Sequence, residues 1–299
     1  MSKTRYHLLP FLAAFLGVGL LALMDAQMKG ASLAIGVFTA SLLRSSLAAA
    51  FIAPVWLVQK TAWPTRPVMR LHIERGVISA FMALSFFYAL TKLPIAEAIA
   101  ISFVAPLLAL YFANLFLGEQ IRRGAIAASV LGLIGTLVIV GGRLGRTQVE
   151  EDALLGIASL LFSALLYAYN FVVIRKQSQV AGPVEVATFH SGVSAAVQML
   201  AAPFLFVIPN PAALLTVAAA AVLTVGGSMA IAWAYARAEA QVLVPVEYTG
   251  FGWAALFGWL FFREAVTLPT IVGVALILLA CWIAAPRARR AANTEVASV

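Results

Sequence analysis

Charged residues are scarce in this chain. They make up 11% of its 299 residues, against about 25% in a typical soluble domain, whereas 63% of the residues are hydrophobic. A soluble fold of this length cannot bury so much apolar surface, so the composition indicates an integral membrane protein. The net charge of +8 does not indicate nucleic acid as a partner, because the basic residues lie in short loops between apolar runs.

Cysteine and the usual chemical motifs are also nearly absent. Cys281 is the single cysteine, and it lies in an apolar run where no internal disulfide can form. The sequence contains no HExxH zinc motif, no GxxxxGK[ST] phosphate loop and no cluster of cysteine and histidine at metal-binding spacing. We therefore expect no catalytic residue, no metal and no cofactor, and predict that the protein is not an enzyme.

Long apolar runs, in contrast, fill the chain. A hydrocarbon core of roughly 30 Å needs about 20 helical residues at 1.5 Å per residue. The fold class that we predict is therefore all-α, a polytopic membrane protein with ten transmembrane helices. The predicted spans are 8–27, 34–58, 73–90, 94–117, 124–141, 154–174, 184–207, 213–236, 241–262 and 267–285.

Two segments of the chain match at an offset of 145 residues, close to half its length. Lys92 and Glu119 frame the fourth span, and Arg237 and Glu264 frame the ninth in the same way. Because five spans is an odd number, a second copy must sit upside down relative to the first. We predict two inverted five-helix repeats at 8–141 and 154–285, a polar linker loop at 142–153, and a cytoplasmic tail at 286–299.

Lysine and arginine set the predicted orientation. With the N-terminus in the cytoplasm, inside segments carry fourteen of these residues and outside segments carry five. This positive-inside bias predicts that both termini are cytoplasmic.

Four ionisable side chains are predicted to lie within spans, where charge is costly and each is a site candidate. Glu247 could contact substrate or a coupling proton, or it could pair with a neighbouring helix. Arg44 is interpreted first as a structural partner for a carboxylate or for carbonyl groups. Asp25 could face water, although its counterpart at the 145 offset is the polar Asn170. His190 is interpreted first as a hydrogen bond between helices.

Two prolines are predicted to break helices near the middle of the membrane. Pro106 leaves the carbonyl of Ser102 without its usual donor, and Pro245 does the same for Gln241. Transporters place substrates beside such broken helices. Glu264 lies at a span end, where we expect a solvated cap or a role in helix packing.

The segments that carry these features resemble a known family. IERGVISAFMALSFFYALTKLPIAEAIAISFVAPLLALYFANLFLGE is similar to the third and fourth helices of EamA-type transporters of the drug/metabolite transporter superfamily. VEYTGFGWAALFGWLFFRE resembles the matching part of their second repeat, with Arg263 where glycine is usual and Phe251 at the place of Pro106.

This resemblance implies ten helices in inverted repeats, termini inside, and a central cavity walled by helices 1, 3, 4, 6, 8 and 9. Members export amino acids, drugs and other metabolites. The chain looks most like aromatic-amino-acid exporters, which implies the bacterial inner (plasma) membrane.

We therefore predict a secondary transporter that exports a small amphipathic metabolite, an amino acid, by alternating access. Its partners are this small-molecule substrate and the lipid bilayer, and the oligomeric state is left open. Glu247 or the Ser102 carbonyl would bind the ammonium group, polar groups on the third and sixth spans the carboxylate, and aromatic rings the side chain. The predicted substrate-binding residues are Phe81, Ser85, Ser102, Phe103, Tyr167, Asn170, Trp233, Glu247, Tyr248 and Trp253.

Two alternatives stay open on the sequence. A multidrug or lipophilic-cation exporter of the same superfamily would depend more on Glu247 and the aromatic walls. A non-transporting membrane scaffold would have no need of inverted symmetry or broken helices.

Overall fold

The structure, a computed structural model, describes residues 5–59, 62–117, 123–144, 151–177, 179–235, 237, 246 and 249–284. No β-strand occurs within these ranges. The helices are α1 (Arg5–Ile35), α2 (Val37–Val58), α3 (Arg66–Lys92), α4 (Ile95–Ser102), α5 (Ala105–Leu117), α6 (Arg123–Leu144), α7 (Glu151–Gln177), α8 (Pro183–Met199), α9 (Ala202–Leu205), α10 (Pro211–Tyr235), α12 (Thr249–Phe262) and α13 (Leu268–Ala284).

The predicted all-α membrane fold is confirmed. Among the described residues, six helical stretches are long and apolar enough to cross a membrane, and shorter apolar helices lie at 129–142, 249–262 and 268–280. Two helices run well past the predicted spans, because α1 continues to Ile35 and α3 begins already at Arg66. Lys29 and Arg70, which lie outside the predicted spans 8–27 and 73–90, are therefore helical.

The predicted break in the fourth span is present. α4 ends at Ser102, the chain turns through Phe103 and Val104, and α5 begins at Ala105. Pro106 has no N–H to donate to the Ser102 carbonyl, which accounts for a break at this point. α4 lies deep in the bundle, and most of its side chains are buried. Pro245 lies outside the described residues.

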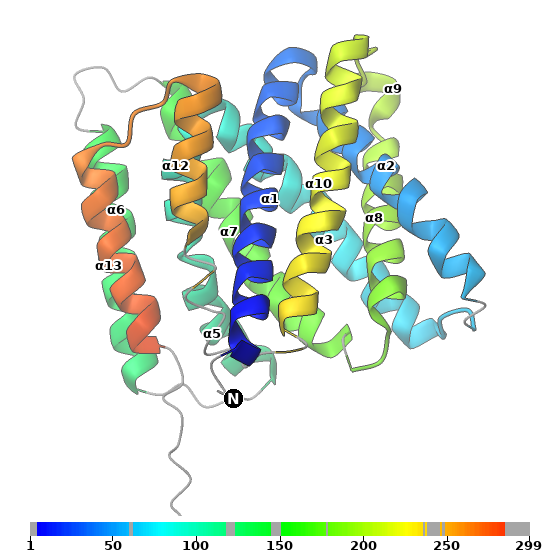
Figure 1. Cartoon of the computed structure of the whole chain (residues 1–299), viewed down its shortest axis with the longest axis horizontal. Coiled ribbons are helices and arrows are strands. Elements are labelled where there is room, and N and C mark those ends of the chain that lie inside the picture. Colours follow the sequence, from blue (N-terminus) through cyan, green and yellow to red (C-terminus); the bar gives the residue numbers. More distant parts are fainter. Residues whose placement is uncertain are drawn as a thin grey trace, which may run out of the picture.

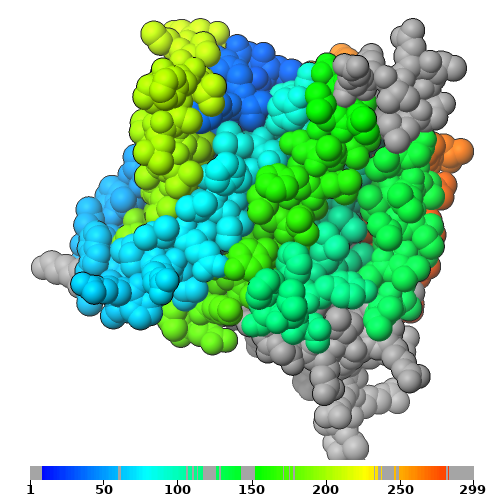
Figure 2. All heavy atoms as spheres, turned by 180° about the vertical axis from the view of Figure 1, so that it is seen from behind, coloured from blue at the N-terminus to red at the C-terminus, as the bar shows by residue number. Residues whose placement is uncertain are grey.

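The helices form a bundle whose faces are easily followed in the figures. α1, α10 and α12 lie on the front, α6 and α13 form one edge, and α2 and α8 lie toward the other (Figure 1). Seen from behind, α3 and α7 lie side by side across the opposite face (Figure 2). We call the end at which α1 ends and α2 begins the outer end, after the predicted orientation, which remains a prediction.

The pattern of helix packing is unchanged when each helix is replaced by its counterpart in the other repeat. α1 packs on α10 as its counterpart α7 packs on α3, and α2 packs on α10 as α8 packs on α3. The pairs α2–α8 and α6–α13 are each formed by equivalent helices of the two halves. This is the arrangement of two inverted five-helix repeats. The exact bounds 8–141 and 154–285 and the linker 142–153 remain a prediction.

Candidate functional site

Ionisable side chains from three helices gather in the middle of the bundle. Asp25 of α1 and Arg44 of α2 are both partly buried and lie close enough for their charges to interact. The Arg44 guanidinium lies over the ring of Phe87 of α3, 5.3 Å from the ring centroid. His190 of α8 is within electrostatic range of Arg44. We call Asp25, Arg44, Phe87 and His190 the central cluster.

Several polar atoms of the interior have no hydrogen-bond partner among the described residues. They include Arg44 Nε, His190 Nδ1, Asn170 Oδ1 and Trp253 Nε1, all of them buried. Buried polar groups in proteins are nearly always paired, so unpaired ones in the interior of a bundle are candidates for contact with a ligand.

At the outer end, a set of contacts joins α1, α4 and the segment that follows α12. Lys29 forms an ion pair with Glu264 and donates to the Leu93 carbonyl at 2.7 Å. The other carboxylate oxygen of Glu264 accepts the backbone N–H of Ile95, the first residue of α4, at 2.7 Å. A carboxylate at a helix N-terminus pairs an otherwise unbonded N–H and is favoured by the helix dipole. We call Lys29, Leu93, Ile95 and Glu264 the outer lock.

Of the two roles expected for Glu264, a solvated cap or a part in helix packing, the structure shows the second, because the side chain is largely buried and bonds two other helices. The backbone conformation of the preceding residue, Arg263, accounts for the direction in which Glu264 points. Arg263 has φ 55°, in the left-handed region that favours glycine, and this turn follows the end of α12. The geometry gives a physical reason for the glycine usual in the resembling motif.

A second polar assembly lies toward the opposite, inner end. His72 is fully buried, and its Nδ1 accepts from the Gln177 amide at 2.6 Å. Its Nε2 therefore carries the proton and donates to Glu185 at 2.9 Å. Arg75 donates to Gln177 at 2.8 Å, and the His72 ring stacks on Phe189. These residues, the inner network, join α3 to α7 and α8.

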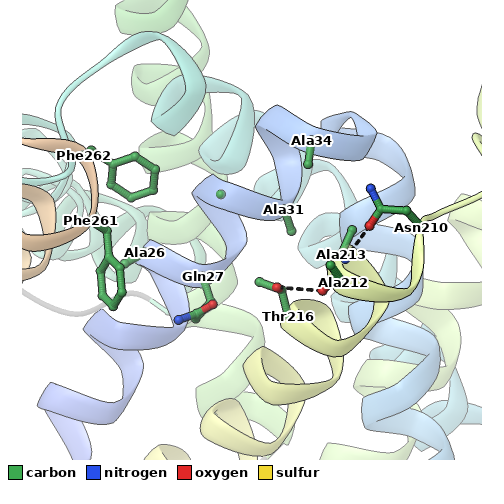
Figure 3. A pocket seen from close by; sticks show the side chains of 11 residues that line it. Ala26, Gln27, Ala31, Ala34, Asn210, Ala212, Ala213, Thr216, Phe261 and Phe262 are labelled. Atoms are coloured by element: carbon green, nitrogen blue, oxygen red, sulfur yellow. Dashed lines mark hydrogen bonds between the residues drawn. The ribbon is translucent and has the colours of Figure 1, made fainter.

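A groove of about 360 Å³ opens between α1, the start of α10 and the end of α12 (Figure 3). Two of its polar groups already have partners, since Asn210 Oδ1 caps the N–H of Ala213 at 2.7 Å and Thr216 donates to the Ala212 carbonyl at 2.9 Å. Phe262 lines the groove and also lies 5.1 Å from Lys29 Nζ. The groove therefore adjoins the outer lock.

The predicted residues of α3, α4 and α7 have varied surroundings. Phe81 and Tyr167 are half-exposed, and the backbone carbonyl of Ser85 accepts from Ser159 of α7 at 3.0 Å. The Ser102 hydroxyl donates to the Ala98 carbonyl of its own helix at 2.8 Å. Asn170 is buried.

The predicted residues of the second half also have varied surroundings. Trp253 packs between Phe257, at 5.7 Å between ring centroids, and Phe15 of α1, at 5.1 Å. Trp233 is half-exposed and lies against the Arg237 guanidinium at 4.3 Å. Glu247 and Tyr248 lie outside the described residues, and Phe103 lies in the turn between α4 and α5. Whether any of the ten contacts substrate remains a prediction.

Sequence reasoning noticed Asp25, Arg44 and His190 one at a time and did not place them in the predicted site. Their charge within apolar runs was the available signal. That Arg44 interacts with both Asp25 and His190 follows from packing between helices far apart in the sequence, and no spacing rule carries this information.

An all-helical bundle with inverted halves, a broken helix and charged groups at mid-depth defines a membrane transporter. The sequence profile of the EamA-like transporter family matches residues 8–141 and again residues 154–285. The chain therefore belongs to the EamA-like transporter family.

Named relatives differ in what they carry. The chain is 27% identical over 269 residues to the pseudopaline exporter CntI of Pseudomonas aeruginosa, covering 87% of this chain and 90% of the relative. It is 29% identical over 224 residues to a riboflavin transporter of Rhizobium johnstonii, covering 74% and 70%. It is 31% identical over 111 residues to the aromatic amino acid exporter YddG of Ancylobacter novellus, covering 36% and 38%. These relatives support a small-molecule transporter of a multi-pass membrane fold.

Proposed function

We propose that this protein is a secondary transporter that exports small amphipathic metabolites, amino acids including aromatic ones, across the bacterial inner membrane. The observation that carries the proposal is the placement of charged groups at mid-depth between two polar assemblies at opposite ends of the bundle. The relative that exports aromatic amino acids and the relative that exports pseudopaline support the direction of transport.

Alternating access gives each assembly a role. The outer lock joins α1 and α4 of the first half to Glu264 of the second half, and the inner network joins α3 of the first half to α7 and α8 of the second. Release to the outside requires the lock to open, and entry from the cytoplasm requires movement at the inner network. The groove beside Phe262 is the exit path that opens when Lys29 and Glu264 separate.

The rings around Trp253 form an apolar cluster between α12 and α1, which in this proposal walls the substrate path deeper in the bundle. Trp253 and Phe257 stack with an interplanar angle of 17°, and Gly19 of α1 leaves room for the indole, because a Cβ there would lie 3.0 Å from the ring. Trp253 Nε1 has no hydrogen-bond partner in the part of the chain that the structure describes, so a donor is available beside the apolar surface. An aromatic amino acid offers the matching ring.

The test is transport by the purified full-length protein in liposomes, with a panel of labelled amino acids, riboflavin and one lipophilic cation. Saturable movement of amino acids, reduced by competing aromatic ones, is the expected result. Movement of the cation alone would overturn the proposal in favour of the multidrug alternative. No movement of any compound would favour the non-transporting scaffold.

A further inference from the structure

We infer that Asp25 and Arg44 bind the two charged groups of an amino-carboxylate substrate, with its ammonium on Asp25 and its carboxylate on Arg44. This inference rests on the proposed function and adds to it a binding subsite and a substrate class.

The two residues lie at the depth that a transported substrate must reach. Asp25 lies ten residues before the end of α1 at Ile35, and Arg44 is the eighth residue of α2, which begins at Val37. At 1.5 Å per residue both lie roughly 10–15 Å below the outer end, close to the middle of a hydrocarbon core of about 30 Å. A transporter binds its substrate near this plane.

Asp25 and Arg44 both have hydrogen-bonding groups that are available to a ligand. Within the described residues, neither side chain takes part in a hydrogen bond or in an ion pair within 4.0 Å, although the two charges interact. Arg44 Nε is buried and has no partner there. A carboxylate accepts several hydrogen bonds and a guanidinium donates five. Charges held inside a membrane protein without direct partners are costly and mark a functional site.

The chemistry around the pair differs at its two ends. On the Arg44 side, Phe87 packs against the guanidinium and His190 offers an Nδ1 that has no partner among the described residues. Arg75 also acts on His190 and has a buried Nε without a partner among the described residues, but its Nη1 donates to Gln177 in the inner network. Arg44 donates no hydrogen bond within the described residues, and it is the cation that we assign to the ligand. On the other side the open group is the Asp25 carboxylate. A carboxylate of the ligand therefore fits toward Arg44 and an ammonium toward Asp25.

A ligand with a single charge satisfies this pair poorly. A monoanion on Arg44 leaves Asp25 near a second negative charge, and a monocation on Asp25 leaves Arg44 near a second positive one. Because the charges of Asp25 and Arg44 interact while the described residues show no ion pair between them within 4.0 Å, a ligand that carries both charges bridges them and satisfies both at once. This argument favours zwitterionic amino-carboxylates over the lipophilic cations of the rival interpretation.

The test compares three ligands that differ by one charged group. Phenylalanine, its amide without the carboxylate, and 3-phenylpropionate without the ammonium compete for transport of labelled phenylalanine in liposomes that contain the full-length protein. The wild type is expected to prefer phenylalanine over both analogues. Arg44→Gln is expected to lose about 10- to 100-fold in apparent affinity for phenylalanine while binding of the amide is unchanged. Asp25→Asn is expected to lose as much for phenylalanine while binding of 3-phenylpropionate is unchanged.

Ratios between ligands separate binding from folding. If Asp25 and Arg44 had only a structural role, substituting either would lower the apparent affinity for all three ligands to the same degree. That result would overturn the inference while leaving amino-acid export intact. Asp25→Glu and Arg44→Lys keep the charges and are expected to restore part of the preference. Asp152→Asn, the same change at an exposed carboxylate, is the matched control and should alter no ratio. A wild type that moves no amino acid would overturn both the proposed function and this inference.

Discussion

Lys29 and Glu264 hold the outer lock through charge-assisted hydrogen bonds in a largely buried setting. A hydrogen bond to a charged group contributes about 1.5–3 kcal/mol, so losing Lys29 should favour opening of this end by roughly tenfold or more. We predict that Lys29→Met increases labelling of a cysteine placed at Ala31, a buried residue of the adjoining groove, by a membrane-impermeant maleimide in a Cys281→Ala background.

A surface ion pair supplies the control for this prediction. Lys92 and Asp152 lie 2.8 Å apart, and the Asp152 side chain is 61% exposed. Such pairs contribute about 0–1 kcal/mol, so Lys92→Met should leave labelling nearly unchanged. Equal effects of the two substitutions would show that the outer lock does not control access to the groove.

Arg263 occupies a backbone conformation that costs a side chain about 1–2 kcal/mol. We predict that Arg263→Gly raises the stability of the protein by about 1 kcal/mol, less any contribution from the guanidinium lying 5.5 Å from the Trp259 ring. The midpoint of thermal unfolding in detergent measures the change. Ala255→Gly, in the helical interior of α12, should instead lower stability by about 1 kcal/mol. A lower midpoint for Arg263→Gly would mean that its side chain has a role beyond the turn.

At the scale of elements, close helix crossings depend on glycine. A Cβ on Gly135 of α6 would lie 2.7 Å from the carbonyl oxygen of Gly273 of α13, which is backbone and cannot move aside cheaply. We predict that Gly135→Ala separates these two helices and lowers the thermal midpoint. Gly141→Ala, in the same helix but with nothing within 4 Å of the added atom, should be neutral or stabilising. The prediction fails if both variants melt alike.

The sequence was most informative about the positions of the helices. Hydropathy located the spans and Pro106 located the break between α4 and α5, because both depend on local chemistry. The end of α1 and the start of α3 were misjudged, since Lys29, Arg66 and Arg70 interrupt the apolar pattern yet lie within these helices. Lys29 and Glu264 are 235 residues apart, and no local pattern links them.

At the scale of the whole molecule, the proposed direction of transport depends on the orientation in the membrane. This orientation is predicted from the distribution of lysine and arginine alone. If both termini are cytoplasmic, Ala265 between α12 and α13 faces outward, whereas Gln179 between α7 and α8 faces the cytoplasm, and both are exposed. In intact cells that produce a Cys281→Ala variant, an impermeant maleimide should label Ala265→Cys and should label Gln179→Cys only after the membrane is opened. The reverse labelling pattern would mean that the protein has the opposite orientation in the membrane. Outer lock and inner network would then exchange sides, the groove at Phe262 would open to the cytoplasm, and uptake would replace export as the direction to test.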